Sequence, residues 1–224
     1  MKRFIIGVSL VAMAVGAQAA VITQWDFNTT FNTTNPAPSI GVGFAALLAG
    51  VTGSSVGGSP NDPGVPINAW NTAGYPAQGT GSGTAGVQFD ASTAGFFGIS
   101  VSFDHRNSNT ASRWSQLQYT LDGTTWTAAA NFDLYDSNFA SRAVDLSSVS
   151  GANNNANFGA RMVTIFDPAN NQTYTATNAP TSSYATAGTS RFDLVTISGT
   201  PVPEPVTMAA FGLGVAAMLR RRRD

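Results

Sequence analysis

The chain has 224 residues, enough for one domain of ordinary size together with terminal addressing segments. Only 10% of its residues are charged, against roughly 25% in an average soluble protein. It contains no cysteine, which excludes disulfide scaffolds, thiolate nucleophiles and cysteine-ligated metal centres.

The charges are distributed unevenly along the chain. If both ends are addressing segments, residues 20–200 keep five arginines and ten aspartates, with no lysine and no glutamate, for a net charge of −5. A protein that binds nucleic acid needs a surface of Lys and Arg to neutralise phosphates. We therefore expect no nucleic-acid partner, and we expect repulsion of polyanions unless a divalent cation mediates the contact.

Residues 1–19 have the pattern of a secretory signal peptide. Two basic residues precede the apolar run Phe4–Val15, and Ala17 and Ala19 supply the small-x-small pattern of a cleavage site. Cleavage after Ala19 would leave Ala20 as the mature N-terminus, after passage through the secretion translocon. The alternative is an uncleaved N-terminal anchor, although the run is shorter than the ~20 residues that span a bilayer.

Residues 20–200 predict an all-β domain, because short alternating runs recur between Gly, Asn, Ser and Pro, and no long helical period appears. Asp122-Gly123 is a hairpin signal between two such runs. The region 50–84 has the composition of a long irregular excursion with at most a short strand. We expect a jelly-roll-like antiparallel two-sheet β-sandwich of roughly eight to ten strands. Predicted strands are Val21–Phe27, Gly98–Asp104, Trp114–Leu121, Thr124–Ala128, Arg142–Leu146, Phe158–Phe166 and Arg191–Ser198.

His105, the only histidine, follows a predicted strand. It could act as a general base with an aspartate as its orienting partner, or it could be an imidazole at a loop edge satisfied by the backbone. No glutamate is present in residues 20–200 to form a catalytic carboxylate pair. We therefore expect no catalytic residues and no enzymatic activity, with a hydrolase as the minority alternative.

Aspartate and asparagine supply the oxygen ligands that Ca²⁺ prefers, so a calcium site is conceivable. The first and last strands of a jelly roll often lie side by side, which would bring Asp26 near Asp193. A second candidate is Asn131–Asp136. The alternative is a set of turn aspartates together with an aspartate–arginine pair such as one formed by Arg191.

Aromatic residues are the candidates for ligand binding. Trp70 and Tyr75 stand in the polar excursion, and Trp114 begins a strand after a polar loop. Such residues could stack on sugars or could cover the open end of the sandwich. Trp25 and Trp126 fall within predicted strands and are expected in the core.

The C-terminus combines three features in order. Pro203, Glu204 and Pro205 form a tripeptide, the uncharged apolar stretch Val206–Leu219 follows it, and the chain then carries a basic run of four adjacent arginines, Arg220, Arg221, Arg222 and Arg223. This combination resembles the PEP-CTERM sorting signal of Gram-negative bacteria, and the sorting segment is assigned to residues 201–224. The resemblance implies a transmembrane helix in the inner membrane and recognition by an exosortase, which passes the protein towards the cell surface or the extracellular polymer. The alternative is a plain C-terminal membrane anchor.

Three segments are similar to parts of the jelly-roll ectodomains frequent among PEP-CTERM proteins, which look like galactose-binding sandwiches. These segments are Ser102–Trp126, Trp25–Asn28 and Arg191–Asp193. The expected function is that of an exported, non-enzymatic protein that could bind exopolysaccharide in biofilm or floc formation. A structural surface protein without a specific ligand and a secreted hydrolase remain the alternatives.

Overall fold

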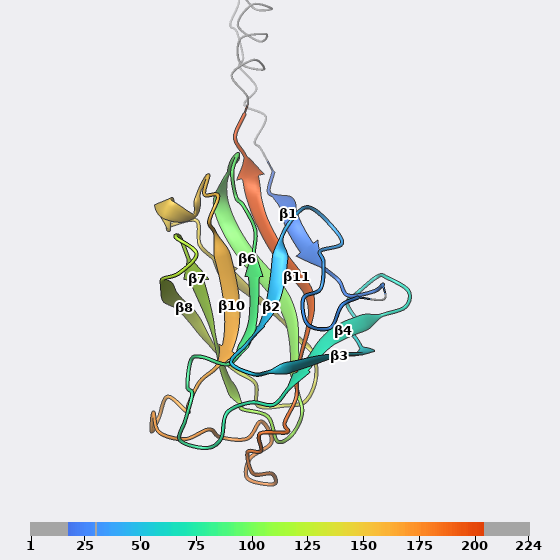
Figure 1. Ribbon diagram of the computed structural model, residues 1–224, viewed down its shortest axis with the longest axis vertical. Helices are drawn as coiled ribbons and strands as arrows, with labels where there is room; N and C mark the ends of the chain where they lie inside the picture. Colours follow the sequence, from blue (N-terminus) through green and yellow to red (C-terminus); the bar gives the residue numbers. More distant parts are fainter. Residues whose placement is uncertain (1–17, 30, 204–224) are drawn as a thin grey trace, which may run out of the picture.

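The computed structural model of the chain describes residues 18–29 and 31–203. These residues form two antiparallel sheets that pack face to face, as Figure 1 shows. The all-β two-sheet sandwich expected from the sequence pattern is therefore confirmed. The predicted signal helix and C-terminal transmembrane helix fall on residues 1–17 and 204–224, outside the described part. Within the described part, no helix is long and apolar enough to cross a membrane.

One sheet has the strand order β3-β4-β11-β6-β9, with β1 also paired to β11, and the other has the order β2-β5-β10-β7-β8. From β5 to β11 the chain passes repeatedly from one sheet to the other, as it does in a jelly roll. The first sheet contains β1 (Ala20–Trp25), β3 (Thr52–Gly57), β4 (Asn68–Ala73), β6 (Phe96–Asn107), β9 (Ala140–Asp145) and β11 (Ser190–Pro201). The second contains β2 (Phe44–Leu48), β5 (Gly86–Asp90), β7 (Trp114–Thr120), β8 (Trp126–Asp133) and β10 (Gly159–Thr164), and a short 3-10 helix, η1 (Ser150–Ala152), precedes β10.

The core lies between the two sheets and follows the strand alternation. Ile99, Val101 and Phe103 of β6 are buried on its inner face, as their spacing predicted. Trp25 of β1 meets Phe89 of β5 edge to face, with ring centroids 4.8 Å apart. Burial of such aromatic pairs from opposite sheets supplies much of the apolar surface that holds the sandwich together.

The predicted hairpin between β7 and β8 turns at Asp122-Gly123. Gly123 has a φ of 78°, a left-handed conformation that residues with a Cβ rarely adopt. The Asp122 carboxylate accepts hydrogen bonds from the backbone N–H groups of Thr124 (2.8 Å) and Thr125 (2.6 Å). These bonds lower the pKa of Asp122 and satisfy the backbone of the turn.

The structure corrects the expectation of an irregular excursion over residues 50–84. This region contains the antiparallel hairpin β3–β4, whose second strand pairs with β11. β3 is an edge strand with both faces largely exposed, so its TGSSVG sequence has no apolar alternation to reveal it. β2 and β5, which had no predicted element, complete one side of the other sheet.

Gly86 lies in the middle of the second sheet, paired with both Leu48 and Val163. A Cβ at this position would collide with the backbone carbonyl oxygen of Met162. We expect Gly86→Ala to lower the free energy of unfolding by about 1–3 kcal/mol, because two sheet strands must move apart. Gly57→Ala is the matched control, since a Cβ there meets nothing within 4 Å. Equal urea midpoints for the two variants would contradict the predicted clash.

Candidate functional site

The aromatic candidates are distributed differently from expectation. Trp70 and Tyr75 are 0% and 4% exposed, respectively. The Trp70 indole N–H donates to the carbonyl of Thr33 (2.8 Å), and the Tyr75 hydroxyl shares a hydrogen bond with Thr72 (2.6 Å). Burial raises the pKa of Tyr75. Neither ring has a free face, so the structure corrects their assignment as ligand-stacking residues: the β3–β4 hairpin folds them into the interior.

Trp126, in contrast, is more exposed than the sequence predicted. Its place in a predicted strand favours the core, but it pairs with Thr120 across β7 and β8 and is only half-buried on the outer face of the second sheet. The guanidinium carbon of Arg161 in β10 lies 4.4 Å from its ring centroid. Because Leu117 of β7 points inward, residues of the opposite parity in the paired strands point outward.

Polar side chains cover this outer face between Trp126 and β5. We call the set Gln88, Gln116, Gln118, Trp126, Asn131 and Arg161 the polar face. Arg161 donates through Nε to Gln118 (2.6 Å), whose amide donates to Gln116 (2.6 Å), whose amide in turn donates to Asn131 (2.8 Å). This relay fixes the orientation of four side chains, so the polar face is preorganised for hydrogen bonding.

The edge of the sheet beside the polar face carries Phe44 and Asp90, which pair across β2 and β5. Phe44 is 51% exposed, and the Asp90 carboxylate accepts a hydrogen bond from Gln88 (2.7 Å). Burial raises the pKa of Asp90, an effect that the Gln88 bond partly offsets. An aromatic ring beside a carboxylate is a pair that can contact both the apolar face and the hydroxyls of a sugar.

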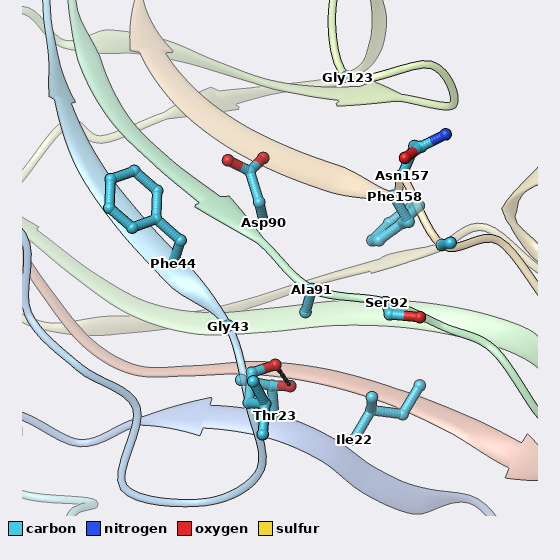
Figure 2. Close-up of a pocket in the computed structure, with 12 residues that line it drawn as sticks. Ile22, Thr23, Gly43, Phe44, Asp90, Ala91, Ser92, Gly123, Asn157 and Phe158 are labelled. Atoms are coloured by element: carbon cyan, nitrogen blue, oxygen red, sulfur yellow. Dashed lines mark hydrogen bonds between the residues drawn. The ribbon is translucent and has the colours of Figure 1, made fainter.

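Phe44 and Asp90 also line an open hollow of about 630 Å³. Figure 2 shows Phe44 and Asp90 on one side of this hollow and Ile22 and Thr23 of β1 on the other. Exposed Asn157 adds an amide to its wall. The hollow is large enough for a small ligand or for one end of a longer one.

A second hollow, of about 510 Å³, opens at the other end of the polar face. Gln116, Gln118 and Asn131 line it together with Phe166 and Asn171 of the loop that follows β10. The polar face therefore runs from one hollow to another. Trp114, the third aromatic candidate, stands on the same side of β7 as Gln116 and beside Arg113, whose guanidinium carbon lies 5.9 Å from its ring centroid.

His105 lies within β6 instead of at a loop edge, which corrects that expectation. It is 1% exposed, and its ring stacks on Phe192 with centroids 4.5 Å apart. Neither ring nitrogen has a hydrogen-bond partner among the described residues. Burial, together with the positive charge of Arg142, lowers its pKa to about 3, so the imidazole is neutral at pH 7.

The two predicted metal-ligating residues have different environments. β1 pairs with β11, so the first and last strands lie side by side, as expected. Asp26 accepts a hydrogen bond from the backbone of Asn28 (3.3 Å), whereas Asp193 is fully buried and accepts from the N–H of Ser59 (2.7 Å). Across residues 18–29 and 31–203, no three His, Cys, Asp or Glu side chains are grouped to hold a metal ion. Calcium binding therefore stays a prediction without a ligand set.

Two further aspartates, which the sequence did not single out, lie near Asp193. Asp104 of β6 accepts hydrogen bonds from Ser141 (2.6 Å) and Asn61 (2.9 Å), and Asp62 of the β3–β4 loop accepts from Asn28 (2.7 Å). Burial, together with the charges of Asp62 and Asp104, raises the pKa of Asp193 to about 7. These carboxylates accept hydrogen bonds from uncharged donors and form no ion pair with any residue that the structure describes. In the described part of the chain the one ion pair joins Arg113 to Asp133.

The sorting segment begins where the sandwich ends. Pro201 is the last residue of β11, and the N–H of Val202 still donates to the carbonyl of Gly95 (2.8 Å). A family model for a protein-sorting motif matches residues 201–223. The chain carries a PEP-CTERM sorting motif. The motif indicates export and sorting by an exosortase to the cell surface, and it covers only the C-terminal end of the chain.

Pro203 is the only residue of the PEP tripeptide within the described part, and it is exposed. The other predicted sorting residues lie outside that part: Glu204, Pro205, Arg220, Arg221, Arg222 and Arg223. All six fall within the span that the PEP-CTERM model matches, so the sequence comparison alone supports their assignment.

The predicted signal cleavage site lies at the border of the described part. Ala17 falls outside it, Ala19 is exposed, and Ala20 begins β1. Cleavage after Ala19 would therefore leave the first strand intact. At the other end of the chain, the match to the PEP-CTERM motif begins at Pro201, the last residue of β11, so no linker separates the motif from the sandwich.

Solved structures resemble the sandwich. The xylanase 10B chain of Clostridium thermocellum, with CBM22-1 and GH10 modules complexed with xylohexaose, matches with a TM-score of 0.51 at 12% identity. The match covers 82% of the present chain, which spans 29% of the length of that one. At this identity the similarity shows the fold alone. No curated protein matches the chain.

Two other matches have lower TM-scores. The K1 cleaved adhesin domain of Lys-gingipain from Porphyromonas gingivalis matches with a TM-score of 0.45 and 12% identity, covering 82% of this chain and 99% of that one. A candidate sugar-binding protein of Bacteroides thetaiotaomicron matches with 0.46 and 11%, covering 81% and 100%.

Proposed function

We propose that this chain is an exported cell-surface or extracellular-matrix protein whose polar face binds exopolysaccharide, in biofilm or floc formation. The observation that carries the proposal is the hydrogen-bonded relay from Arg161 to Asn131 beside the half-buried Trp126 ring. Planar amide and guanidinium groups hydrogen-bond hydroxyls, while an indole stacks on the apolar face of a sugar ring. The PEP-CTERM motif, which indicates export to the cell surface, supports the same proposal.

The charges of the polar face favour an uncharged glycan. Arg161 is its one cation, and that guanidinium is already engaged by Trp126 and Gln118. Burial lowers the pKa of Arg161. Residues 20–200 carry a net charge of −5, which repels polyanionic chains at long range. We expect neutral polysaccharides to bind and binding to depend only weakly on ionic strength.

The test is a glycan screen, with and without calcium, on the exported chain and two variants. We expect Trp126→Ala to weaken binding by about 2 kcal/mol, roughly thirtyfold in Kd, because it removes a stacking surface and the partner of Arg161. Tyr135→Ala is the matched control, since Tyr135 is 65% exposed but lies outside the polar face. No binding to any glycan, or equal weakening in both variants, would refute the proposal and leave a purely structural surface protein.

We also propose that the chain has no enzymatic activity. The burial of His105 in the core supports this, because a general base must reach the substrate proton that it removes. Products released from a bound glycan by the intact chain, and lost in His105→Ala at unchanged binding, would instead establish the hydrolase alternative.

A further inference from the structure

The start of the first strand, β1, and the end of the last strand, β11, lie at the same end of the sandwich, as Figure 1 shows. Ala20 pairs with Gly199, and Pro201 pairs with Phe96 at the start of β6. The loop that enters β11 lies at the opposite end of the molecule. The end that contains Ala20 and Pro201 is therefore the one closest to any membrane segment that follows.

The chain between this end and the apolar tail is short. Val202 is still hydrogen-bonded to Gly95, and the apolar stretch of the sequence begins at Val206. Four extended residues reach at most about 14 Å. If the tail crosses the bilayer in the precursor, as the sequence predicts, this end cannot move far from the lipid headgroups.

Exposed apolar side chains gather at the same end. Val21 of β1, Phe97 of β6 and Val202 after β11 are 42%, 43% and 49% exposed, and strand pairing brings their positions together. We call these three residues the apolar end. Burial of apolar side chains, Phe included, at the boundary between headgroups and acyl chains stabilises contact with a bilayer, and a net charge of −5 over residues 20–200 offers no attraction to anionic lipid.

We propose that in the membrane-anchored precursor the apolar end rests in the headgroup layer of the bilayer. The contact holds the sandwich upright on the membrane and keeps Pro203 at the lipid surface, where a membrane-embedded exosortase can reach the motif. It is independent of glycan binding, because none of its three residues belongs to the polar face.

Because the chain has no cysteine, single cysteines can carry an environment-sensitive fluorophore without background. The full chain is reconstituted in phosphatidylcholine vesicles containing a shallow nitroxide lipid, with the label at Ala94→Cys or Ser183→Cys. Ala94 is exposed two residues before β6, and Ser183 is exposed in the loop that enters β11. We expect strong quenching at Ala94, no quenching at Ser183, and loss of the Ala94 quenching when Phe97 and Val202 are both replaced by serine.

Flotation of the vesicles reports separately whether the tail anchors the chain. Flotation with equal quenching at Ala94 and Ser183 would overturn the proposal, because the sandwich would then be tethered without a preferred face. Ala94 quenching that survives Phe97→Ser with Val202→Ser would show that the tether alone causes proximity, and would also overturn it. A chain that fails to float would remove the tether on which the proposal rests.

Discussion

Replacing Trp70 by alanine is expected to lower the free energy of unfolding by about 3–5 kcal/mol, the usual cost of emptying a large aromatic site in a core. Trp70 is completely buried, and its ring centroid lies 5.9 Å from those of both Phe27 and Phe89. The variant also leaves the carbonyl of Thr33 without its indole donor. Urea denaturation monitored by circular dichroism measures the change.

Trp126→Ala is expected to reduce glycan binding much more than it reduces stability. Its ring is half-buried on the outer face, so we expect a loss of stability near or below about 1 kcal/mol, with a large loss of glycan binding. A folded Trp70→Ala protein should keep its glycan affinity. If Trp126→Ala lowered the free energy of unfolding more than Trp70→Ala does, the assignment of Trp70 to the core and of Trp126 to the polar face would be refuted.

The second large effect is a decrease in stability as the pH rises, caused by Asp193. Burial and two neighbouring carboxylates raise its pKa to about 7 in the folded state, against about 3.8 in the unfolded chain. Between these values the folded state binds the extra proton, so the free energy of unfolding falls as the pH rises from about 4 to about 7 and changes little above it. The loss is at most about 4 kcal/mol.

Asp193→Asn should abolish this pH dependence, because the amide does not titrate; its oxygen can accept only one of the two hydrogen bonds that Ser59 (2.7 Å) and Leu194 (2.8 Å) donate to the carboxylate. We expect the free energy of unfolding of the variant to change less between pH 4 and pH 8 than that of the natural chain. Asp136→Asn, at an exposed position, is the control. Unfolding is followed from pH 4 to pH 8 in the presence of a chelator, so that cations do not neutralise Asp62 and Asp104. A parallel loss of stability in the natural chain and the Asp193 variant would contradict the assignment.

Strand patterns predicted the interior of the sandwich well where one face of a strand is buried. The alternation of β6 and β7 and the Asp122-Gly123 turn were readable because burial on one side imposes a two-residue period. The β3–β4 hairpin was not readable, since its edge strand has little to bury. Trp70 and Tyr75 took their places in the core only because this hairpin folds against β11.

The candidate site depends on strands that are distant in the sequence. Arg161, Gln118 and Trp126 lie on three strands, and nothing in their local sequences distinguishes their polar spacing from that of any solvent-facing strand. The inward alternation of Leu117 and Tyr119 was a usable signal: it places Thr120 on the opposite face and, through the hairpin, its partner Trp126. The register of that hairpin, with its bulge at Leu117/Gln118, comes only from the structure.

By itself the sequence determined the all-β class and the address of the protein, because strand alternation and the PEP-CTERM motif are local patterns that need no partner to be read. Tertiary structure decided which tryptophans are buried, which aspartates lie together and which glutamines line the polar face. These properties depend on the order and register of strands in two sheets, where residues more than 100 positions apart become neighbours, as Ser59 and Asp193 do.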